Sequence, residues 1–297
     1  MSEPIHHHYL PVFYLKQWAR FDGRIVRYHR PHRSVVCSAI APSHTAYEPH
    51  LYALDGYPAA DRQRIEKEYM GRLVDEPASR AMQVLHERNR SKLTPDLRSA
   101  WTRFAMSLRL RNPDTVKEIQ KDARAELSRQ LQKQPEEYAA VKRDSDPATL
   151  LEWAEQNATF LLENMGKLML PTLIDNEKIG QAIFEMDWWV IDFSSGAVSL
   201  VTSDRPFVMT TPLKEERCVI ALPIGPRHAF FAARHARLIT RTLEKKGITG
   251  LAKALNESIV VQAARHVYGQ DESHMRFVER RLETIDGVQT TDSTSSD

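Results

Sequence analysis

The sequence has few of the residues that mark several common classes of protein. Only two cysteines, Cys37 and Cys218, occur in 297 residues, too few and too far apart for a disulfide framework or for a zinc site with paired thiolates. Eleven glycines leave little room for a glycine-rich phosphate loop, and neither a Walker sequence nor a dinucleotide fingerprint is present. Disulfide-stapled secreted proteins and nucleotide-cofactor enzymes are therefore both disfavoured.

A charge excess and a long apolar run are also missing. The 41 basic and 39 acidic residues give a formal net charge of +2, so no global attraction to nucleic acid or anionic lipid is implied. No apolar stretch approaches the roughly 20 residues that cross a bilayer. The N-terminus also lacks the basic flank and cleavage site of a secretory signal. We expect a cytoplasmic protein with no membrane partner.

The order of the sequence patterns predicts an α+β fold. Two β-rich runs, residues 24–29 and 34–40, flank a proline-containing turn and predict an N-terminal β-hairpin. Helical periodicity dominates residues 61–185, where Thr94-Pro95 and Asn112-Pro113 each resemble an N-cap followed by a first-turn proline. Short alternating runs follow in residues 187–235 and predict an antiparallel sheet in the C-terminal half. We expect this sheet to pack against several of the helices.

This organisation indicates a single compact domain over residues 1–285, which is long enough to bury a substantial core. Residues 286–297 have almost nothing to bury, so we expect a disordered tail. No internal repeat is apparent, which argues against a solenoid.

The stretch IHHHYLPVFYLKQWA at residues 5–19 contains the most ligand-like residues of the chain. In an extended segment His6 and His8 lie on one side and His7 on the other. Neutral imidazole is a common metal ligand, and its proton moves near pH 7, so these residues suit a metal site or acid–base catalysis. Alternatively, the histidines bond to backbone groups and the aromatic side chains anchor the segment in the core.

This opening, together with shorter motifs further along, resembles an uncharacterised and mainly bacterial family, the domain-of-unknown-function family 4238. The resemblance spans roughly residues 5–268 and implies a set of candidate residues but no reaction. The sequence departs from the family pattern at Asn112, where threonine is common, and at Arg205, where asparagine is common. The matching positions are residues 7–19, Tyr47-Glu48, Leu51-Tyr52, Glu66, Glu76, Arg111-Asn112-Pro113, Trp188 to Val190, Thr202 to Pro206, Asn256 and Tyr268.

Asp204 and Arg111 stand at the ends of predicted elements. Pro206 cannot donate to a sheet ladder, so the preceding strand should end near Asp204 and direct its carboxylate to a sheet edge. There it would serve as a ligand or base, or it would accept backbone N–H groups in an Asx-type turn. Arg111 ends a helix and would bind either the exposed helix carbonyls or an anion.

Glu66 and Glu76 lie ten residues apart in a predicted helical region. On an uninterrupted α-helix they do not share a face, so both reach one site only if the region bends at Pro77. Solvated helix charges paired with neighbouring arginines are the alternative.

Three further arginines are candidates for contact with an anion or a nucleic acid. Arg27 and Arg30 lie in the predicted hairpin among aromatic residues and histidines, a composition that can follow a phosphate backbone. Arg205 follows Asp204. A solvated hairpin tip that protects an edge strand would explain the first two equally well.

Two hypotheses from different classes follow. In the first, the protein is a metal-dependent hydrolase of phosphodiesters, similar to a nuclease, that acts on nucleic acid or another phosphate-bearing ligand. His7, His8 and Asp204 hold a divalent ion or share acid–base duty, Glu66 or Glu76 completes the ligand set, and Arg111 neutralises transition-state charge. Such a set suits zinc, manganese or iron.

In the second hypothesis the protein is a non-catalytic recognition or defence-associated protein, and its His-aromatic opening is structural. The sequence leaves the substrate, the metal and the oligomeric state open.

Overall fold

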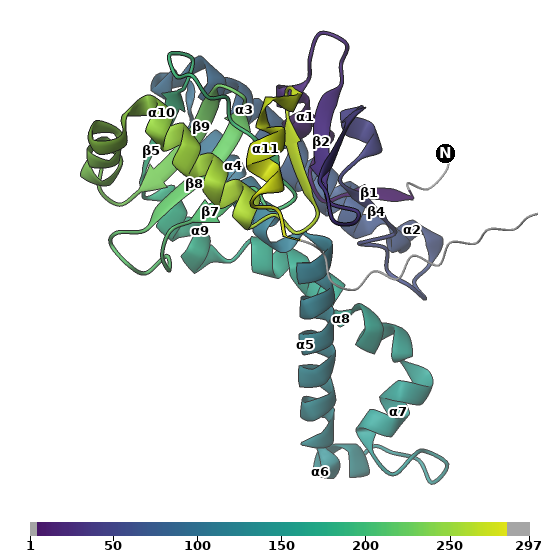
Figure 1. Ribbon diagram of the computed structural model, residues 1–297. Coiled ribbons are helices and arrows are strands. Elements are labelled where there is room, and N and C mark those ends of the chain that lie inside the picture. The colour runs from purple at the N-terminus through teal and green to yellow at the C-terminus, as the bar shows by residue number, and fades with distance from the viewer. Residues whose placement is uncertain (1–4, 284–297) are drawn as a thin grey trace, which may run out of the picture.

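The computed structural model describes residues 5–283. Figure 1 shows the fold of this part of the chain. The predicted tail at residues 286–297 lies outside the described residues. The α+β prediction is confirmed, with antiparallel sheets packed against helices.

Within residues 5–283 the strands form three antiparallel sheets. The smallest pairs β1 with β4. A second has the order β3-β2-β10-β6, and a third has the order β5-β9-β8-β7. The strands are β1 (His6–His8), β2 (Ile25–His29), β3 (Val36–Ile40), β4 (Tyr47–Pro49), β5 (Asp187–Asp192), β6 (Thr202–Ser203), β7 (Val208–Met209), β8 (Val219–Gly225), β9 (His228–Ala233) and β10 (His266–Gly269).

The predicted hairpin is β2 and β3, which pair in register from Ile25 with Ile40 to His29 with Val36. The sequence did not indicate that this hairpin is extended by strands from the far end of the chain. β10 pairs with β2, placing His266 opposite His29, and β6 pairs with the other side of β10. This sheet therefore brings residues from the first and last parts of the chain together.

Helices occupy most of the region between residues 59 and 184, as predicted. Thr94 accepts a hydrogen bond from the amide of Leu97, and Asn112 accepts one from the amide of Asp114, which confirms both expected N-caps. The α-helices are α1 (Val12–Leu15), α2 (Ala59–Arg62), α3 (Glu76–Glu87), α4 (Pro95–Leu110), α5 (Pro113–Gln132), α6 (Pro135–Ala139), α7 (Leu150–Asn157), α8 (Thr159–Ile174), α9 (Glu177–Phe184), α10 (Arg237–Val261) and α11 (Met275–Glu279).

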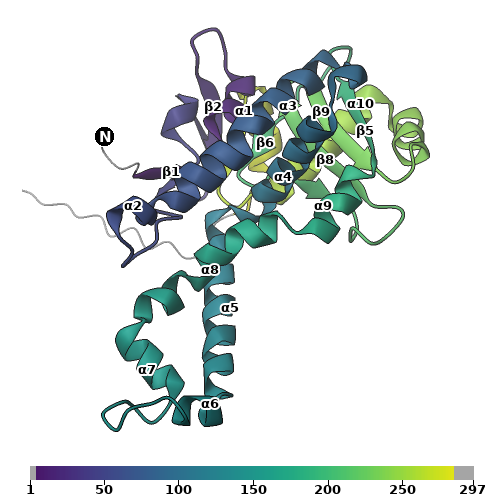
Figure 2. The same ribbon diagram turned by 180° about the vertical axis from the view of Figure 1, so that it is seen from behind.

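The third sheet separates two hydrophobic clusters. Phe230 lies on one face with Trp101 of α4, and Phe231 lies on the other with residues of α10. Figures 1 and 2 show α10 on one side of this sheet and α3 and α4 on the other. Each large apolar side chain that is fully buried stabilises the fold by about 1.5–3 kcal/mol.

Four helices form an arm that projects from this body. Figures 1 and 2 show α5 and α8 leaving the body together, with α6 and α7 at the far end. A Cβ atom at Gly166 of α8 would come within 2.4 Å of Gln120 Cα in α5. Only glycine permits this close approach, which holds the base of the arm together. Within the described residues, no helix combines the length and apolar character needed to cross a membrane.

Candidate functional site

The opening segment is anchored by its aromatic side chains. Tyr14 and Trp18 are fully buried. The hydroxyl of Tyr14 donates to the carbonyl of Pro223 at 2.8 Å, and the indole N–H of Trp18 donates to the carbonyl of Leu200 at 2.9 Å. The segment therefore fastens the second and third sheets to each other near β6 and β8.

His7, the middle residue of strand β1, is completely buried. Its Nδ1 accepts a hydrogen bond of 2.9 Å from the amide of Tyr52, and its ring stacks on the Tyr52 ring with centroids 5.7 Å apart. The Nδ1 atom that accepts this hydrogen bond carries no proton. The ring thereby satisfies a buried backbone amide, as in the structural alternative.

Arg111 lies at the C-terminal end of α4 and is 1% exposed. Its Nη1 donates to Asp75 Oδ1 at 2.7 Å, and its Nη2 donates to Asp75 Oδ2 at 3.2 Å and to the carbonyl of His8 at 2.7 Å. Burial raises the pKa of Asp75, and the adjacent guanidinium opposes that rise. The guanidinium thus fastens β1 to the helical region. Sequence reasoning missed Asp75.

Glu66 faces the same buried guanidinium from an unusual helix. Residues Ile65–Asp75 form a π-helix with i→i+5 hydrogen bonds. In such a helix a separation of nine residues, as between Glu66 and Asp75, spans roughly two turns. Glu66 and Asp75 therefore share a side, whereas they would be opposed on an α-helix. Glu76 starts α3 on the exposed surface, where Arg80 donates to it at 2.9 Å. Pro77 stands in the first turn of α3, which a proline tolerates without a bend.

The Glu66 carboxyl has an ionisation poised near neutrality. Burial raises its pKa to about 7, although Arg111 and the backbone N–H of His8 oppose the rise. Its Oε2 is buried and has no hydrogen-bond partner among the described residues, and the same holds for Nε2 of His8. We call His7, His8, Glu66, Asp75 and Arg111 the N-terminal cluster.

Asp204 lies buried in the loop after β6, and its carboxylate accepts hydrogen bonds from three backbone N–H groups. Its Oδ1 accepts from Ala264 at 2.9 Å, and its Oδ2 accepts from Arg265 at 2.6 Å and from His266 at 3.1 Å. Burial raises its pKa to about 6, while these three amides oppose the rise. Both carboxylate oxygens therefore bind the start of β10, an anchoring role close to the Asx-type alternative but with partners distant in sequence.

Two connections join the N-terminal cluster to the Asp204 loop. Asn112, which follows Arg111, donates from Nδ2 to the carbonyl of Asp204 at 3.2 Å. Arg265 donates to Glu48 at 2.7 Å, and Glu48 pairs with His7 across β1 and β4. His7, Arg111 and Asp204 thus belong to one continuous network, whereas Glu76 lies outside it. Nevertheless, residues 5–283 contain no group of three or more His, Cys, Asp or Glu side chains arranged to hold a metal ion.

The three candidate anion-binding arginines differ in their surroundings. The Arg30 guanidinium donates to the carbonyls of Leu282, Arg33 and Glu279. Arg205 donates to Asp114 at 3.0 Å on the surface. Arg27 lies half-buried on β2, and its Nε is buried without a partner among the described residues.

Arg27 belongs to a group of polar side chains on one face of the second sheet. Strand alternation puts Arg27 and His29 on this face, and the register adds Ser38 of β3 opposite Arg27 and His266 of β10 opposite His29. The rings of His29 and His266 have centroids 6.0 Å apart. We call Arg27, His29, Ser38 and His266 the histidine face.

Each residue of the histidine face has a buried polar atom without a partner among the described residues. The atoms are Arg27 Nε, His29 Nδ1, Ser38 Oγ and His266 Nδ1. Burial, and then Arg27, lower the pKa of His29; burial, Arg27 and His29 lower the pKa of His266 to about 3. Alternation in the hairpin could have revealed Arg27 with His29. Nothing local could have indicated His266, because only strand pairing brings it there.

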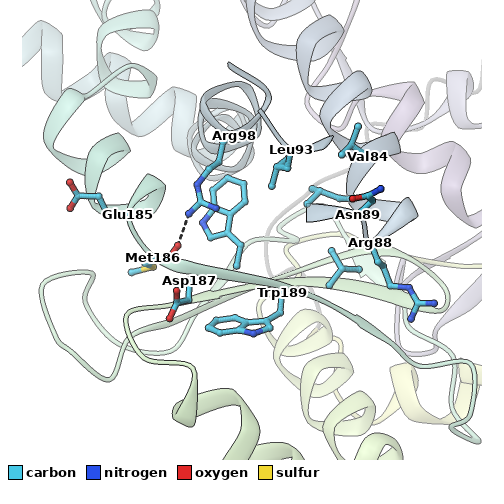
Figure 3. A pocket seen from close by; sticks show the side chains of 12 residues that line it. Val84, Arg88, Asn89, Leu93, Arg98, Glu185, Met186, Asp187 and Trp189 are labelled. Carbon is cyan, nitrogen blue, oxygen red and sulfur yellow. Dashed lines mark hydrogen bonds between the residues drawn. The ribbon is translucent and has the colours of Figure 1, made fainter. Parts of the chain in front are cut away.

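A separate cavity of about 320 Å³ lies beside the edge strand β5. Figure 3 shows the guanidinium of Arg98 bonded to the carbonyl of Met186, with Arg88 on the opposite side of the cavity. Arg98 also lies 4.0 Å above the ring of Trp188. The cavity contains Trp188 and Val190 of the family motif, but its lining includes no residue of the N-terminal cluster or of the histidine face.

The fold is thus an α+β body with a projecting helical arm, and several of its motif residues, among them His7, Glu48, Arg111, Asn112 and Asp204, form one internal network. The family model described as DUF4238, protein of unknown function, matches residues 6–273, so the chain belongs to this family. The resemblance inferred from the sequence motifs is confirmed. No curated protein and no solved structure matches the chain.

Proposed function

We propose that this protein is a hydrolase of phosphodiesters that binds the phosphate group on the histidine face. The single observation that carries the proposal is the pairing of His29 with His266 on adjacent strands, with rings 6.0 Å apart and Arg27 beside them. Two imidazoles flanking an anion suit proton transfer to and from opposite sides of a phosphorus atom.

The unpaired polar atoms support an anionic ligand at this face. A buried polar atom without a partner carries a free-energy penalty of about 1–3 kcal/mol. A phosphate oxygen accepts hydrogen bonds from a guanidinium N–H, an imidazole N–H and a hydroxyl group. Binding of phosphate to Arg27, His29, Ser38 and His266 would therefore satisfy atoms that have no partner among the described residues.

The lowered pKa values of both histidines suit this chemistry once the ligand is considered. Burial and the charge of Arg27 disfavour the imidazolium forms in the free protein. A bound phosphodiester brings a negative charge that offsets Arg27, so the pKa values of both rings rise.

In the proposed reaction, His266 accepts a proton from water as the water oxygen attacks phosphorus. The bond from phosphorus to the leaving oxygen breaks, and His29 donates its proton to that oxygen. Arg27 stabilises the charge on the other phosphate oxygens. Exchange with solvent then restores the starting protonation of both rings.

The N-terminal segment supports this face indirectly. Tyr268, two residues beyond His266, exchanges hydrogen bonds with Thr45, at 3.1 Å, and with Tyr9. Asp204 holds the amide of His266. The Tyr268 contacts fix the position of β10 relative to the N-terminal part of the chain, and the Asp204 contact fixes it relative to the loop after β6. Precise placement of acid and base groups is a general requirement of such catalysis.

Two predictions from the sequence stay separate from this proposal. The first is direct catalysis by His7, His8, Asp204 and Arg111. The second is a divalent zinc, manganese or iron ion held by His7, His8, Asp204, Glu66 and Glu76. No step above depends on either. In this metal prediction Glu66 and His8 are the better placed ligands, since each has a buried atom without a partner among the described residues.

The experiment is hydrolysis of bis(4-nitrophenyl) phosphate and of single-stranded RNA by the purified chain. We expect His29→Asn, His266→Asn and Arg27→Gln each to lower kcat/KM by about 10²–10⁴-fold. His32→Asn is the matched control, because His32 lies exposed at the hairpin tip, and it should keep full activity. Unchanged activity in both the His29 and the His266 variants would contradict the proposal.

A second candidate is a non-catalytic recognition role, which the projecting arm favours. Val141 is 77% exposed on the arm, and Trp153 and Leu161 are partly exposed there, an arrangement that protein partners often use. Under this alternative, none of the histidine-face variants changes any hydrolytic activity. Replacing Trp153 with serine would instead abolish binding to a partner.

A further inference from the structure

The second sheet has another group of polar residues near its opposite face. Tyr28 and Arg27 are neighbours on β2 and therefore point to opposite sides. The Tyr28 hydroxyl donates to the carbonyl of Asp271, which lines a cavity of about 540 Å³. The loop at residues 197–199, the helix α10 and the segment from Asp271 to Phe277 surround this cavity. A space of this size accommodates a small molecule.

Ser199 and His274 form a hydrogen-bonded pair in this cavity. Ser199 Oγ lies 2.9 Å from His274 Nε2, within the range for a serine and its general base. His274 is 7% exposed. Burial lowers the pKa of His274, although Asp271 opposes this. Burial thus favours the neutral imidazole, whose Nε2 accepts the hydroxyl proton when Nδ1 carries the ring proton.

The backbone around Ser199 is held rigidly. Asn256, which is 1% exposed on α10, donates from Nδ2 to the carbonyl of Ser199 at 2.8 Å and accepts from the amide of Val201 at 3.0 Å. Trp18 binds the carbonyl of Leu200 between them. Asn256 therefore positions the serine segment, which gives this family-motif residue a specific role.

Cationic side chains outnumber anionic ones around the pair. Arg227, Lys253 and Arg281 line the cavity, together with Glu257 and Asp271. Arg281 is paired with Glu257 at 2.9 Å, so Arg227 and Lys253 face the single carboxylate of Asp271. This balance favours a substrate with a negative charge, and the same cations would stabilise an oxyanion that forms during acyl transfer.

We propose that Ser199 and His274 form a nucleophile and general-base pair that hydrolyses small carboxylic esters bearing an anionic group. The Oγ of Ser199 bonds to the ester carbonyl carbon as His274 takes the hydroxyl proton. The carbon–oxygen bond to the alcohol breaks, and His274 returns the proton to the leaving alcohol. Water then hydrolyses the acyl group from Ser199 by the same route, which restores the serine.

Covalent labelling tests this assignment without knowledge of the natural substrate. A fluorophosphonate probe phosphonylates an activated serine: the Oγ–P bond forms, fluoride leaves, and His274 takes the proton. We expect intact-mass analysis of the wild-type chain to show one added phosphonyl group, and peptide mapping to place it on Ser199. Ser199→Ala should abolish labelling, and His274→Gln should slow it by about 10²-fold or more.

Ser194→Ala is the matched control, because Ser194 is an exposed serine in the same connection between β5 and β6, and it should be labelled at the wild-type rate. Absence of labelling in the folded wild-type chain overturns the proposal, and so does an unchanged rate in a folded His274→Gln variant. His29→Asn and His266→Asn should be labelled normally, so failure at the histidine face and failure at Ser199 are distinguishable.

Discussion

The N-terminal cluster and the histidine face contain similar side chains, but the hydrogen-bonding groups of these side chains find different partners in the two regions. In the cluster, Arg111 binds a carboxylate and a carbonyl, and His7 accepts from a backbone amide. On the histidine face, Arg27, His29 and His266 each have a buried atom without a partner among the described residues. The comparison suggests that His7 and Arg111 hold the fold together, whereas His29 and His266 are available to a ligand. In the cluster, Arg111 Nε, His8 Nε2 and Glu66 Oε2 also have no partner among the described residues.

The largest expected effect tests whether the N-terminal cluster is structural. Arg111→Met removes the buried partner of Asp75, and breaking such a pair destabilises a protein by about 3–5 kcal/mol. Urea denaturation monitored by circular dichroism measures this free energy of unfolding. Arg205→Met is the matched control, since Arg205 pairs with Asp114 at the surface, and it should lose less than about 1 kcal/mol. Equal losses in both variants would contradict the distinction.

A somewhat smaller loss is expected for His7→Ala. The substitution leaves the buried amide of Tyr52 without an acceptor and opens a cavity, which together should lower the free energy of unfolding by about 2–4 kcal/mol. Thermal and urea denaturation both report it. A variant that keeps wild-type stability but loses hydrolytic activity would instead favour a catalytic role for His7.

The pH dependence of stability sharpens the comparison further. Since the pKa of Glu66 is raised to about 7 in the folded protein, its contribution stabilises the fold at low pH and is lost as pH rises from its ordinary pKa to about 7. Glu66→Gln should remove this dependence and become the more stable protein at pH 8.5, by about 1–3 kcal/mol. Urea denaturation at pH 4.5 and pH 8.5 gives both values. A wild-type chain that gains stability across this range relative to the variant would refute the assignment.

The smallest expected effect on stability belongs to the histidine face. The Nδ1 atom of His29 has no partner among the described residues, so His29→Asn should change the free energy of unfolding by less than about 0.5 kcal/mol. The same variant should lose most of the phosphodiesterase activity. A large loss of stability would show that His29 has a structural role after all.

The parts of this fold that depend on neighbouring residues could be predicted from the sequence. The hairpin and the helix starts at Thr94 and Asn112 follow from turn and capping chemistry, which acts over a few residues. The π-helix does not follow from such local chemistry. Its altered period explains why Glu66 shares a face with Asp75 and not with Glu76. The sequence motifs include His7, Glu66, Arg111 and Asp204 but could not reveal which of their atoms would be left without a partner among the described residues.

Sites that depend on strand pairing between distant segments were beyond local reasoning. His266 reaches His29 only because β10 joins the hairpin, and Ser199 reaches His274 only because the segment after β10 returns to the connection between β5 and β6. No spacing rule relates such residues, since the folded chain alone sets their separation.

The most direct measurement for the central claim is the ring pKa of His29 and of His266, followed by nuclear magnetic resonance with and without dimethyl phosphate. Both residues should begin below the ordinary value for histidine and rise when the phosphodiester binds, because its negative charge offsets Arg27. Titration curves for His29 and His266 that are identical with and without the ligand would contradict phosphate binding at this face.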